Sequence, residues 1–139
     1  MIRYESDTSA ISPDDLQGFF VGWPNPPSAE THLGILKGSD HVVLAREDSK
    51  GRVVGFVTAI TDGVLAAYLP LLEVLPEYQG RGIGGELVRR MLAQLDGLYM
   101  IDAVCDDDVV PFYQEFGMVK ATAVARRDYD AQNGRKRTG

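Results

Sequence analysis

The sequence predicts a single-domain mixed α/β fold, in which an antiparallel front half of the sheet precedes one parallel strand–helix–strand crossover. Three observations predict this class. Short valine-rich segments alternate with turn residues in the first half of the chain, which is typical of an antiparallel meander. A segment with apolar residues on one helical stripe, 83–96, lies between two apolar segments. The chain of 139 residues can also bury a core of its own. This order of segments gives about four helices around one sheet.

The first elements are expected to be a strand over residues 2–5 and two helices. The first helix is predicted to begin at Ser12, since serine caps helices, proline fits a first turn and two acidic residues follow. It should carry Leu16, Phe19 and Phe20. Prolines make residues 23–27 a loop. The second helix should run over 28–37 and be closed by a glycine.

The strands of the meander follow. Residues 41–46 and 52–60 are rich in valine and are predicted to pair through a turn at 47–51. A third strand is expected over 64–75, with a bulge at Pro70, because proline cannot donate to the ladder.

The back half is expected to contain the crossover. A helix opened by glycines should extend to about Asp96. A strand over 98–105, a short helix over 109–116 and a last strand over 118–126 should follow. The domain is therefore placed at residues 1–127, and residues 128–139 are a polar basic tail.

Composition argues against several classes of function. The net charge of −6 disfavours a nucleic-acid partner and mildly favours cationic small molecules. The single cysteine, Cys105, allows no internal disulfide framework and no zinc-ligand cluster, so no metal is expected. No apolar run reaches the roughly 20 residues that span a bilayer. The first residues do not have the charged-then-apolar order of a secretory signal. We therefore expect a cytoplasmic protein without a membrane partner.

The most informative segment is the run from Gln79 to Gly85, at the start of the predicted crossover helix. Glycine weakens a helix by roughly 1 kcal/mol relative to alanine, so four glycines between residues 80 and 85 indicate that bare backbone is needed there. A row of N–H groups at the positive end of a helix is a site for an anion such as a pyrophosphate.

Two known phosphate cradles can be compared with this run. A P-loop needs Lys-Ser or Lys-Thr after its last glycine, and Glu86 stands there instead, so that interpretation fails. The dinucleotide fingerprint fits better, since Gly80, Gly82 and Gly85 have its spacing and Asp102 follows after about 20 residues. Residues 76–79 separate the strand from the first glycine, however, and the chain has room for few further strand–helix units. A dinucleotide site therefore stays as the alternative.

A longer segment, 71–84, resembles the coenzyme A site of the GNAT-type N-acetyltransferases. Their signature Gln/Arg-x-x-Gly-x-Gly/Ala is met by Gln79, Gly82 and Gly84. A second segment, 111–118, is similar to the family's Phe-Tyr-x-x-x-Gly-Phe element, with methionine in place of the closing phenylalanine. Two linked motifs in the right order are more specific than either alone. The likeness covers roughly residues 1–127 and implies a GNAT-like fold.

The resemblance implies acetyl-coenzyme A as co-substrate. The pyrophosphate would meet the main chain of the glycine run, with added charge from an arginine, and the pantetheine arm would pair with main-chain groups of Leu72 and Val74, much as a peptide pairs with a sheet edge. Asp107 stands where the family often has an asparagine, beside the Phe112 motif position. The implied donor site is Leu72, Val74, Gln79, Gly80, Arg81, Gly82, Ile83, Gly84, Gly85, Asp107 and Phe112.

Two residues are candidates for proton transfer. Tyr113 takes the place of the family tyrosine and would protonate the departing thiolate. Glu73, in an otherwise apolar strand, could act through water as base for the amine, and it could equally be an outward-facing strand residue. Because Cys105 and the two histidines have no evident partner, direct attack in a ternary complex is favoured over a covalent intermediate.

The acceptor is expected to be a primary amine of a small molecule or peptide, cationic or aromatic. Phe20, Trp23 and Tyr68 are predicted to form an apolar wall for it, with Trp23 singled out by its proline-rich loop. A homodimer is possible, since dimers are common in the family. The alternative function on the same fold is a non-catalytic acyl-CoA sensor.

Overall fold

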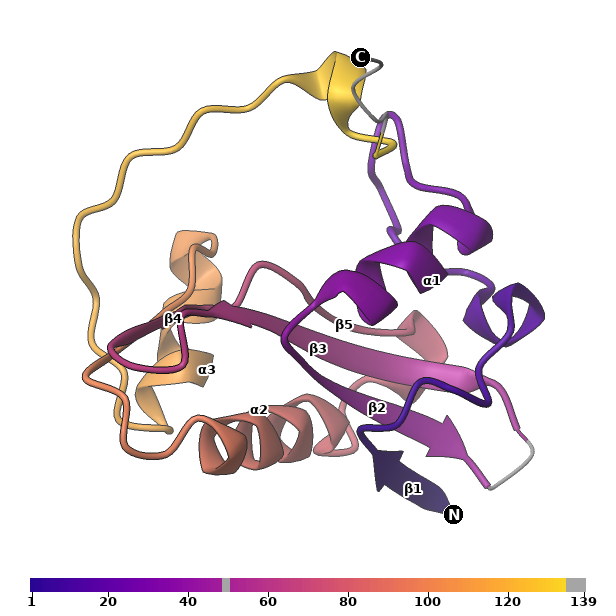
Figure 1. Cartoon of the computed structure of the whole chain (residues 1–139), viewed down its shortest axis with the longest axis horizontal. Coiled ribbons are helices and arrows are strands. Elements are labelled where there is room, and N and C mark those ends of the chain that lie inside the picture. The colour runs from indigo at the N-terminus through magenta and orange to yellow at the C-terminus, as the bar shows by residue number, and fades with distance from the viewer. Residues whose placement is uncertain (49–50, 135–139) are drawn as a thin grey trace.

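A six-stranded mixed sheet forms the centre of the computed structural model, which describes residues 1–48 and 51–134 (Figure 1). The sheet order is β1-β2-β3-β4-β6, and β5 also pairs with β3. Only the pairing of β4 with β6 is parallel among the described strands, so the predicted antiparallel front and single crossover are confirmed. The strands are β1 (Ile2–Glu5), β2 (His41–Glu47), β3 (Val53–Thr61), β4 (Ala66–Tyr68), β5 (Leu72–Val74) and β6 (Met100–Asp102).

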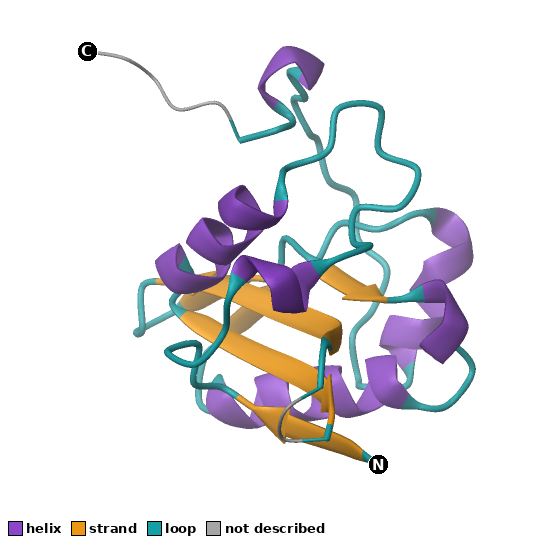
Figure 2. Cartoon of the chain, turned by 90° about the vertical axis from the view of Figure 1, so that its right-hand side faces the viewer, coloured by secondary structure: helices purple, strands orange, loops and turns teal. Residues whose placement is uncertain are grey.

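Two helices cover opposite faces of the sheet, α1 (Ala29–Gly38) and α2 (Ile83–Gln94) (Figures 1 and 2). Helix α1 begins where predicted, because the Oγ atom of Ser28 accepts a hydrogen bond from the N–H of Thr31 at 3.1 Å. The predicted apolar stripe of α2 is buried against the sheet. A third helix, α3 (Val110–Gln114), follows a 3₁₀ turn over Asp107–Val109 and matches the expected short helix.

Strand β3 has both of its faces covered. Val54 and Val57 belong to the core beneath α2, while Val53 and Phe56 belong to the core beneath α1. A strand buried on both faces has a continuous apolar sequence, which explains its valine-rich run. Because β3 is packed on both faces, it is a rigid partner for β5, which pairs with it.

The helix predicted from Ser12 is wrong in its length. A single 3₁₀ turn, Pro13–Leu16, forms there, and the carboxylate of Asp15 caps it by accepting the N–H of Ser12 at 2.9 Å. Gly18 (φ 92°) and Phe20 (φ 63°) then adopt left-handed backbone conformations, which end a right-handed helix. Phe19 and Phe20 therefore lie in a loop.

The third predicted strand is divided into β4 and β5 at Pro70, where the bulge was expected. The strand predicted over 98–105 is confined to the three residues of β6. The predicted turn at 47–51 lies partly outside the described residues.

The predicted last strand over 118–126 is not part of the sheet. The chain leaves α3 and runs as an extended arc toward α1, ending in a 3₁₀ turn over Tyr129–Ala131 (Figure 1). Strand propensity does not make a strand without a partner to pair with. The last basic residues, 135–139, lie outside the described residues, and the boundary at residue 127 stays a prediction.

Candidate functional site

Strands β5 and β6 part at Pro70. Before it, β4 pairs with β6, and the N–H of Leu69 donates to the carbonyl of Asp102 at 2.9 Å. After it, β5 pairs with β3 alone among the described strands, in the register that places Phe56 opposite Glu73. The edge of β5 that faces away from β3 is therefore open.

The open edge of β5 carries the main-chain groups of Leu72 and Val74. The carbonyl of Leu71 and the N–H of Leu75 bond to β3, and alternation along an antiparallel ladder turns the groups of residues 72 and 74 to the other side. The carbonyl of Val74 accepts the side-chain amide of Gln79 at 2.9 Å. No acceptor in residues 1–48 and 51–134 takes the N–H groups of Leu72 and Val74, as the pantetheine interpretation of these two residues requires.

The glycine run forms the entry to α2. Gly80 (φ 77°) and Gly82 (φ 81°) have left-handed backbone conformations, and the space that a Cβ atom would occupy on either is open. The first main-chain bond of the helix is from the N–H of Glu86 to the carbonyl of Gly82, at 3.1 Å. Within the described residues, none of the N–H groups from Gly80 to Gly85 donates to an acceptor of the chain. These groups constitute a site for an anion at a helix N-terminus.

The polar side chains of the run stabilise its course. The amide of Gln79 joins it to β5, as described above. Arg81 donates to the carbonyl of Glu77 at 3.2 Å, and its guanidinium lies 5.0 Å from the centre of the Tyr78 ring. The Ile83 side chain is buried in the core, so only its main chain can take part in the site.

Helix α3 packs on the start of α2 through its aromatic residues. Phe112 lies 3.7 Å from the place of a Cβ atom on Gly84, and Phe116 lies 3.5 Å from that on Gly85. Two of the glycines are therefore partly explained by this packing. This contact places the second predicted motif, 111–118, against the first, 71–84.

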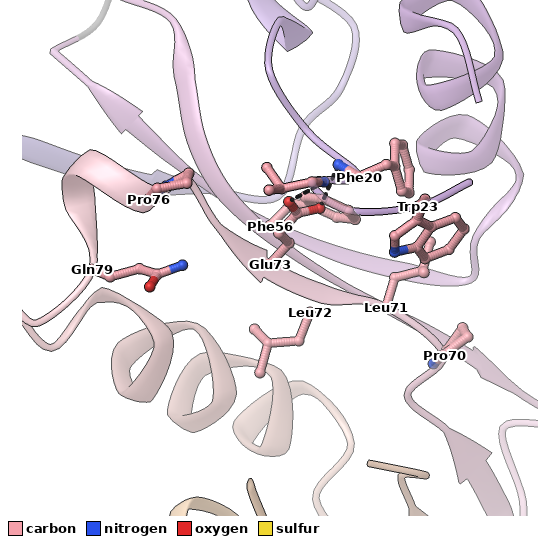
Figure 3. A pocket seen from close by; sticks show the side chains of 10 residues that line it. Phe20, Trp23, Phe56, Pro70, Leu71, Leu72, Glu73, Pro76 and Gln79 are labelled. Carbon is pink, nitrogen blue, oxygen red and sulfur yellow. Dashed lines mark hydrogen bonds between the residues drawn. The ribbon is translucent and has the colours of Figure 1, made fainter. Parts of the chain in front are cut away.

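A cavity of about 400 Å³ lies beside β5, and its lining includes several predicted residues, from Phe20 and Trp23 to Gln79 at the start of the glycine run (Figure 3). The carboxylate of Glu73 accepts the N–H of Phe20 at 2.8 Å and the N–H of Val21 at 3.3 Å. Trp23 packs on Phe20, with ring centres 4.8 Å apart. The lining is Phe20, Val21, Trp23, Phe56, Pro70, Leu71, Leu72, Glu73, Pro76 and Gln79.

Glu73 thus has a structural contact that the sequence did not suggest. Its carboxylate holds the left-handed turn at Phe20 in place across 53 residues of sequence. The same carboxylate lies at the cavity, half-buried, where it can meet a cationic group. Its role as a base stays a prediction.

Tyr113, Tyr68 and Asp107 lie outside this cavity. Tyr113 is half-buried on α3, and burial, with a smaller contribution from Cys105, raises the pKa of its phenol. Tyr68 ends β4 opposite Ile60 and is partly exposed. The carboxylate of Asp107 is exposed and lies 3.2 Å from the Nζ atom of Lys120.

Five lining residues were not predicted as site residues, namely Val21, Phe56, Pro70, Leu71 and Pro76. Phe56 is opposite Glu73 in the ladder, and Val21 is placed by the Glu73 carboxylate. The expected bulge at Pro70 was a usable signal, because a bulge redirects the side chains around it.

Comparisons with known proteins identify the family of the chain. Residues 9–118 match the family model of the acetyltransferase (GNAT) family. The chain belongs to the GNAT family. Its sheet differs from the doubly wound order of the dinucleotide alternative, which is therefore wrong as a description of the fold.

Individual relatives agree with this membership. The crystal structure of a candidate acetyltransferase from Deinococcus radiodurans R1 is 48% identical, with a TM-score of 0.94 over 97% of this chain and 94% of that one. A GNAT family protein of Streptococcus pneumoniae shares the fold, with 24% identity and a TM-score of 0.71 over 92% of this chain and all of that one. An uncharacterised N-acetyltransferase of Porphyra purpurea, ycf52, is 28% identical over 84% of this chain and 70% of its own length.

Two further findings concern the described residues alone. No group of three or more histidine, cysteine, aspartate or glutamate side chains in 1–48 and 51–134 is placed to hold a metal ion. None of the helices in that part of the chain has the length and apolar character needed to cross a bilayer.

Proposed function

We propose that this GNAT chain transfers the acetyl group of acetyl-coenzyme A to a primary amine, by direct attack in a ternary complex. One observation carries the proposal: within the described residues, the N–H groups of residues 80–85 and those of Leu72 and Val74 have no acceptor, and the bond from Gln79 to the carbonyl of Val74 joins the two segments. The first set suits a pyrophosphate, and the second suits an extended amide-containing chain. Coenzyme A contains both in one molecule.

The residues of the chain would divide the chemistry as follows. The N–H of Leu72 or Val74 stabilises the negative charge that develops on the thioester oxygen when the amine attacks. Glu73, acting through a water molecule, receives the proton that the amine loses. Tyr113 gives its proton to the departing thiolate. A phenol with an ordinary pKa is already protonated at neutral pH, which is the state that a general acid needs, and burial raises the pKa of Tyr113 further.

The acceptor we propose is a cationic amine with an aromatic or aliphatic body. The rings of Phe20, Trp23 and Phe56 give the cavity an apolar wall, and the carboxylate of Glu73 lies at its edge. A cation beside a partly buried carboxylate and an aromatic face is favourably placed. We propose that the enzyme acts in the cytoplasm, without a metal and without nucleic acid or membrane as partner.

Release of free thiol from acetyl-coenzyme A tests the proposal. Acetyl-coenzyme A should raise the melting temperature, and an amine from a panel of aralkylamines, polyamines and amino acids should release thiol at a saturable rate. Tyr113→Phe should lower kcat while the affinity for acetyl-coenzyme A stays within twofold. Wild-type turnover in this variant would remove the acid role of Tyr113.

A non-catalytic acyl-CoA sensor is the second candidate. It is favoured by the engagement of both Glu73 oxygens with the loop and by the position of Tyr113 outside the cavity. A sensor would show the same rise in melting temperature but no thiol release with any amine, and Tyr113→Phe would change neither result. The thiol assay therefore separates the two functions.

A further inference from the structure

The loop beside the proposed acceptor cavity, residues 20–27 and here called the acceptor loop, is held at both of its ends. At its start, the carboxylate of Glu73 accepts the N–H groups of residues 20 and 21. Near its other end, Asn25 makes two hydrogen bonds to residues that lie 107 and 104 positions later in the chain. Three residues, 22–24, separate the two anchors, and Trp23 is the middle one.

The second anchor is formed by residues 128–134, here called the C-terminal turn (Figure 1). The main-chain N–H of Asn25 donates to the Oε1 atom of Gln132 at 2.8 Å. The side-chain amide of Asn25 donates to the carbonyl of Tyr129 at 3.1 Å. Asn25 is thus bonded through its main chain and its side chain together, which fixes both its position and its orientation.

The C-terminal turn has a conformation of its own. Three N–H groups within residues 131–134 each donate to the carbonyl three residues earlier, at 3.0 to 3.2 Å. The carboxylate of Asp128 caps the start of the turn by accepting the N–H of Asp130 at 3.1 Å. Gly134, with φ 82°, closes the turn against α1, since a Cβ atom on it would lie 2.6 Å from Cγ2 of Thr31. Glycine is needed there for the backbone conformation and for the close approach.

The contact with the acceptor loop and α1 is what holds the C-terminal turn on the domain. Between residues 119 and 134, Ala131 and Gln132 alone are partly buried. The segment that leads to the turn, 119–127, is an exposed arc, and within the described residues none of its main-chain N–H groups donates a hydrogen bond. The arc therefore does not place the turn, and the contacts with Asn25 and Thr31 do.

Trp23 lies in the short span between the two anchors and has few constraints besides them. Its N–H donates to the carbonyl of Phe20 at 3.2 Å, and its ring packs on that of Phe20 at the cavity (Figure 3). The side chain is still 37% exposed. Pro24, whose ring restricts the backbone, joins Trp23 to Asn25. The position of Asn25 therefore constrains the position of the indole.

We propose that Gln132 and Asn25 are positioning residues of the acceptor site: the C-terminal turn docks on the acceptor loop and holds Trp23 where it forms the wall of the cavity. The inference rests on the proposed function, because it takes the cavity as the place of the amine. Neither positioning residue belongs to the lining of the cavity, so both act through Trp23. When the turn is released, amine binding must order residues 22–24, which weakens the affinity for the amine and leaves the donor site unchanged.

Fluorescence tests the placement of Trp23 without any substrate. Trp23 is the single tryptophan of the chain, so the decay of its fluorescence anisotropy reports the motion of this one ring on the nanosecond timescale. Gln132→Ala removes the acceptor of the Asn25 N–H and should increase the rotational freedom of the indole. Gln132→Glu keeps an oxygen acceptor and should behave as the wild type. The matched control is Asn133→Ala, which removes an exposed amide of the same turn and should leave the decay unchanged. An unchanged decay in Gln132→Ala would overturn the proposal, and so would an equal change in the control.

Steady-state kinetics connect the placement of Trp23 to the amine. With an amine that releases thiol, Gln132→Ala should raise KM for the amine severalfold, while kcat and the dissociation constant of acetyl-coenzyme A stay within about twofold. Gln132→Glu should restore the KM of the wild type. A fall in kcat or in donor affinity as large as the rise in KM would indicate a general loss of structure and would overturn the positioning role. If no amine releases thiol, the proposed function fails, whereas the anisotropy decay independently decides whether the C-terminal turn holds Trp23.

Discussion

A buried histidine should make the stability of this fold depend on pH between 6.5 and 4. His32 is 1% exposed, and its ring lies among those of Phe19, Phe20 and Phe56, with ring centres 4.4 to 5.3 Å away. Within the described residues, neither ring nitrogen has a hydrogen-bond partner. Burial lowers the pKa of the imidazole from 6.5 to about 4, because a charge there would lose its water.

The sign and size of the effect follow from proton linkage. Between the two pKa values the unfolded chain binds a proton at His32 and the folded chain does not, so the free energy of unfolding rises with pH in this window. The stability is fully present above pH 6.5 and is lost as the pH falls to about 4. Each unit of pKa difference corresponds to 1.36 kcal/mol, which gives a loss of about 3 kcal/mol.

Urea unfolding at pH 7 and at pH 4.5 measures this loss. His32→Phe keeps an aromatic ring in the cluster and removes the titration, while the carboxylates titrate equally in both proteins. The stability of the wild type relative to His32→Phe should therefore fall by about 2 to 3 kcal/mol between the two pH values. A relative stability that is independent of pH would refute the assignment of a neutral, desolvated His32.

Three further substitutions test the site. Gly82→Val should weaken the binding of acetyl-coenzyme A at least tenfold, measured by calorimetry, because a β-branched residue is strained at φ 81° and would displace the row of N–H groups. The control Gly63→Val, at φ 75° in a distant turn, introduces similar strain and should bind acetyl-coenzyme A with normal affinity. Equal affinities of the two variants for acetyl-coenzyme A would contradict the proposal that the glycine run binds the pyrophosphate. Glu73→Gln should lower kcat at least tenfold, and an unchanged kcat would exclude Glu73 as the base. It should also reduce the melting temperature by a few degrees, since a hydrogen bond to a charged group contributes about 1.5 to 3 kcal/mol to stability. Trp23→Ala should raise KM for the amine severalfold with unchanged donor affinity, and the reverse pattern would place Trp23 at the donor.

The parts of the fold that the sequence predicted well depend on local patterns. The buried stripe of α2 has a regular helical period, and β3 is continuously apolar because both of its faces are covered. The glycine run was recognisable because its backbone conformation depends on residues that are adjacent in the chain.

The parts that were missed depend on distant contacts. The region after Pro13 has a helix start, but the Glu73 carboxylate holds a left-handed turn at Phe20 from 53 residues away, and no local signal shows this. Residues 118–126 have strand propensity, but whether they pair is decided by the position of an edge to pair with. A tertiary contact outweighed local preference in the first place, and the absence of a described partner strand did so in the second.

The short stretch from Glu73 to Gln79 couples the two halves of the site mechanically. Glu73 anchors the loop that walls the acceptor cavity, while Gln79 ties the glycine run back to the carbonyl of Val74. We expect a change in the proposed acceptor loop to reach the proposed donor cradle through these few residues. Engineering this chain for a new amine would have to vary Phe20, Val21 and Trp23 around an unchanged Glu73, or risk misaligning the thioester along with the pocket.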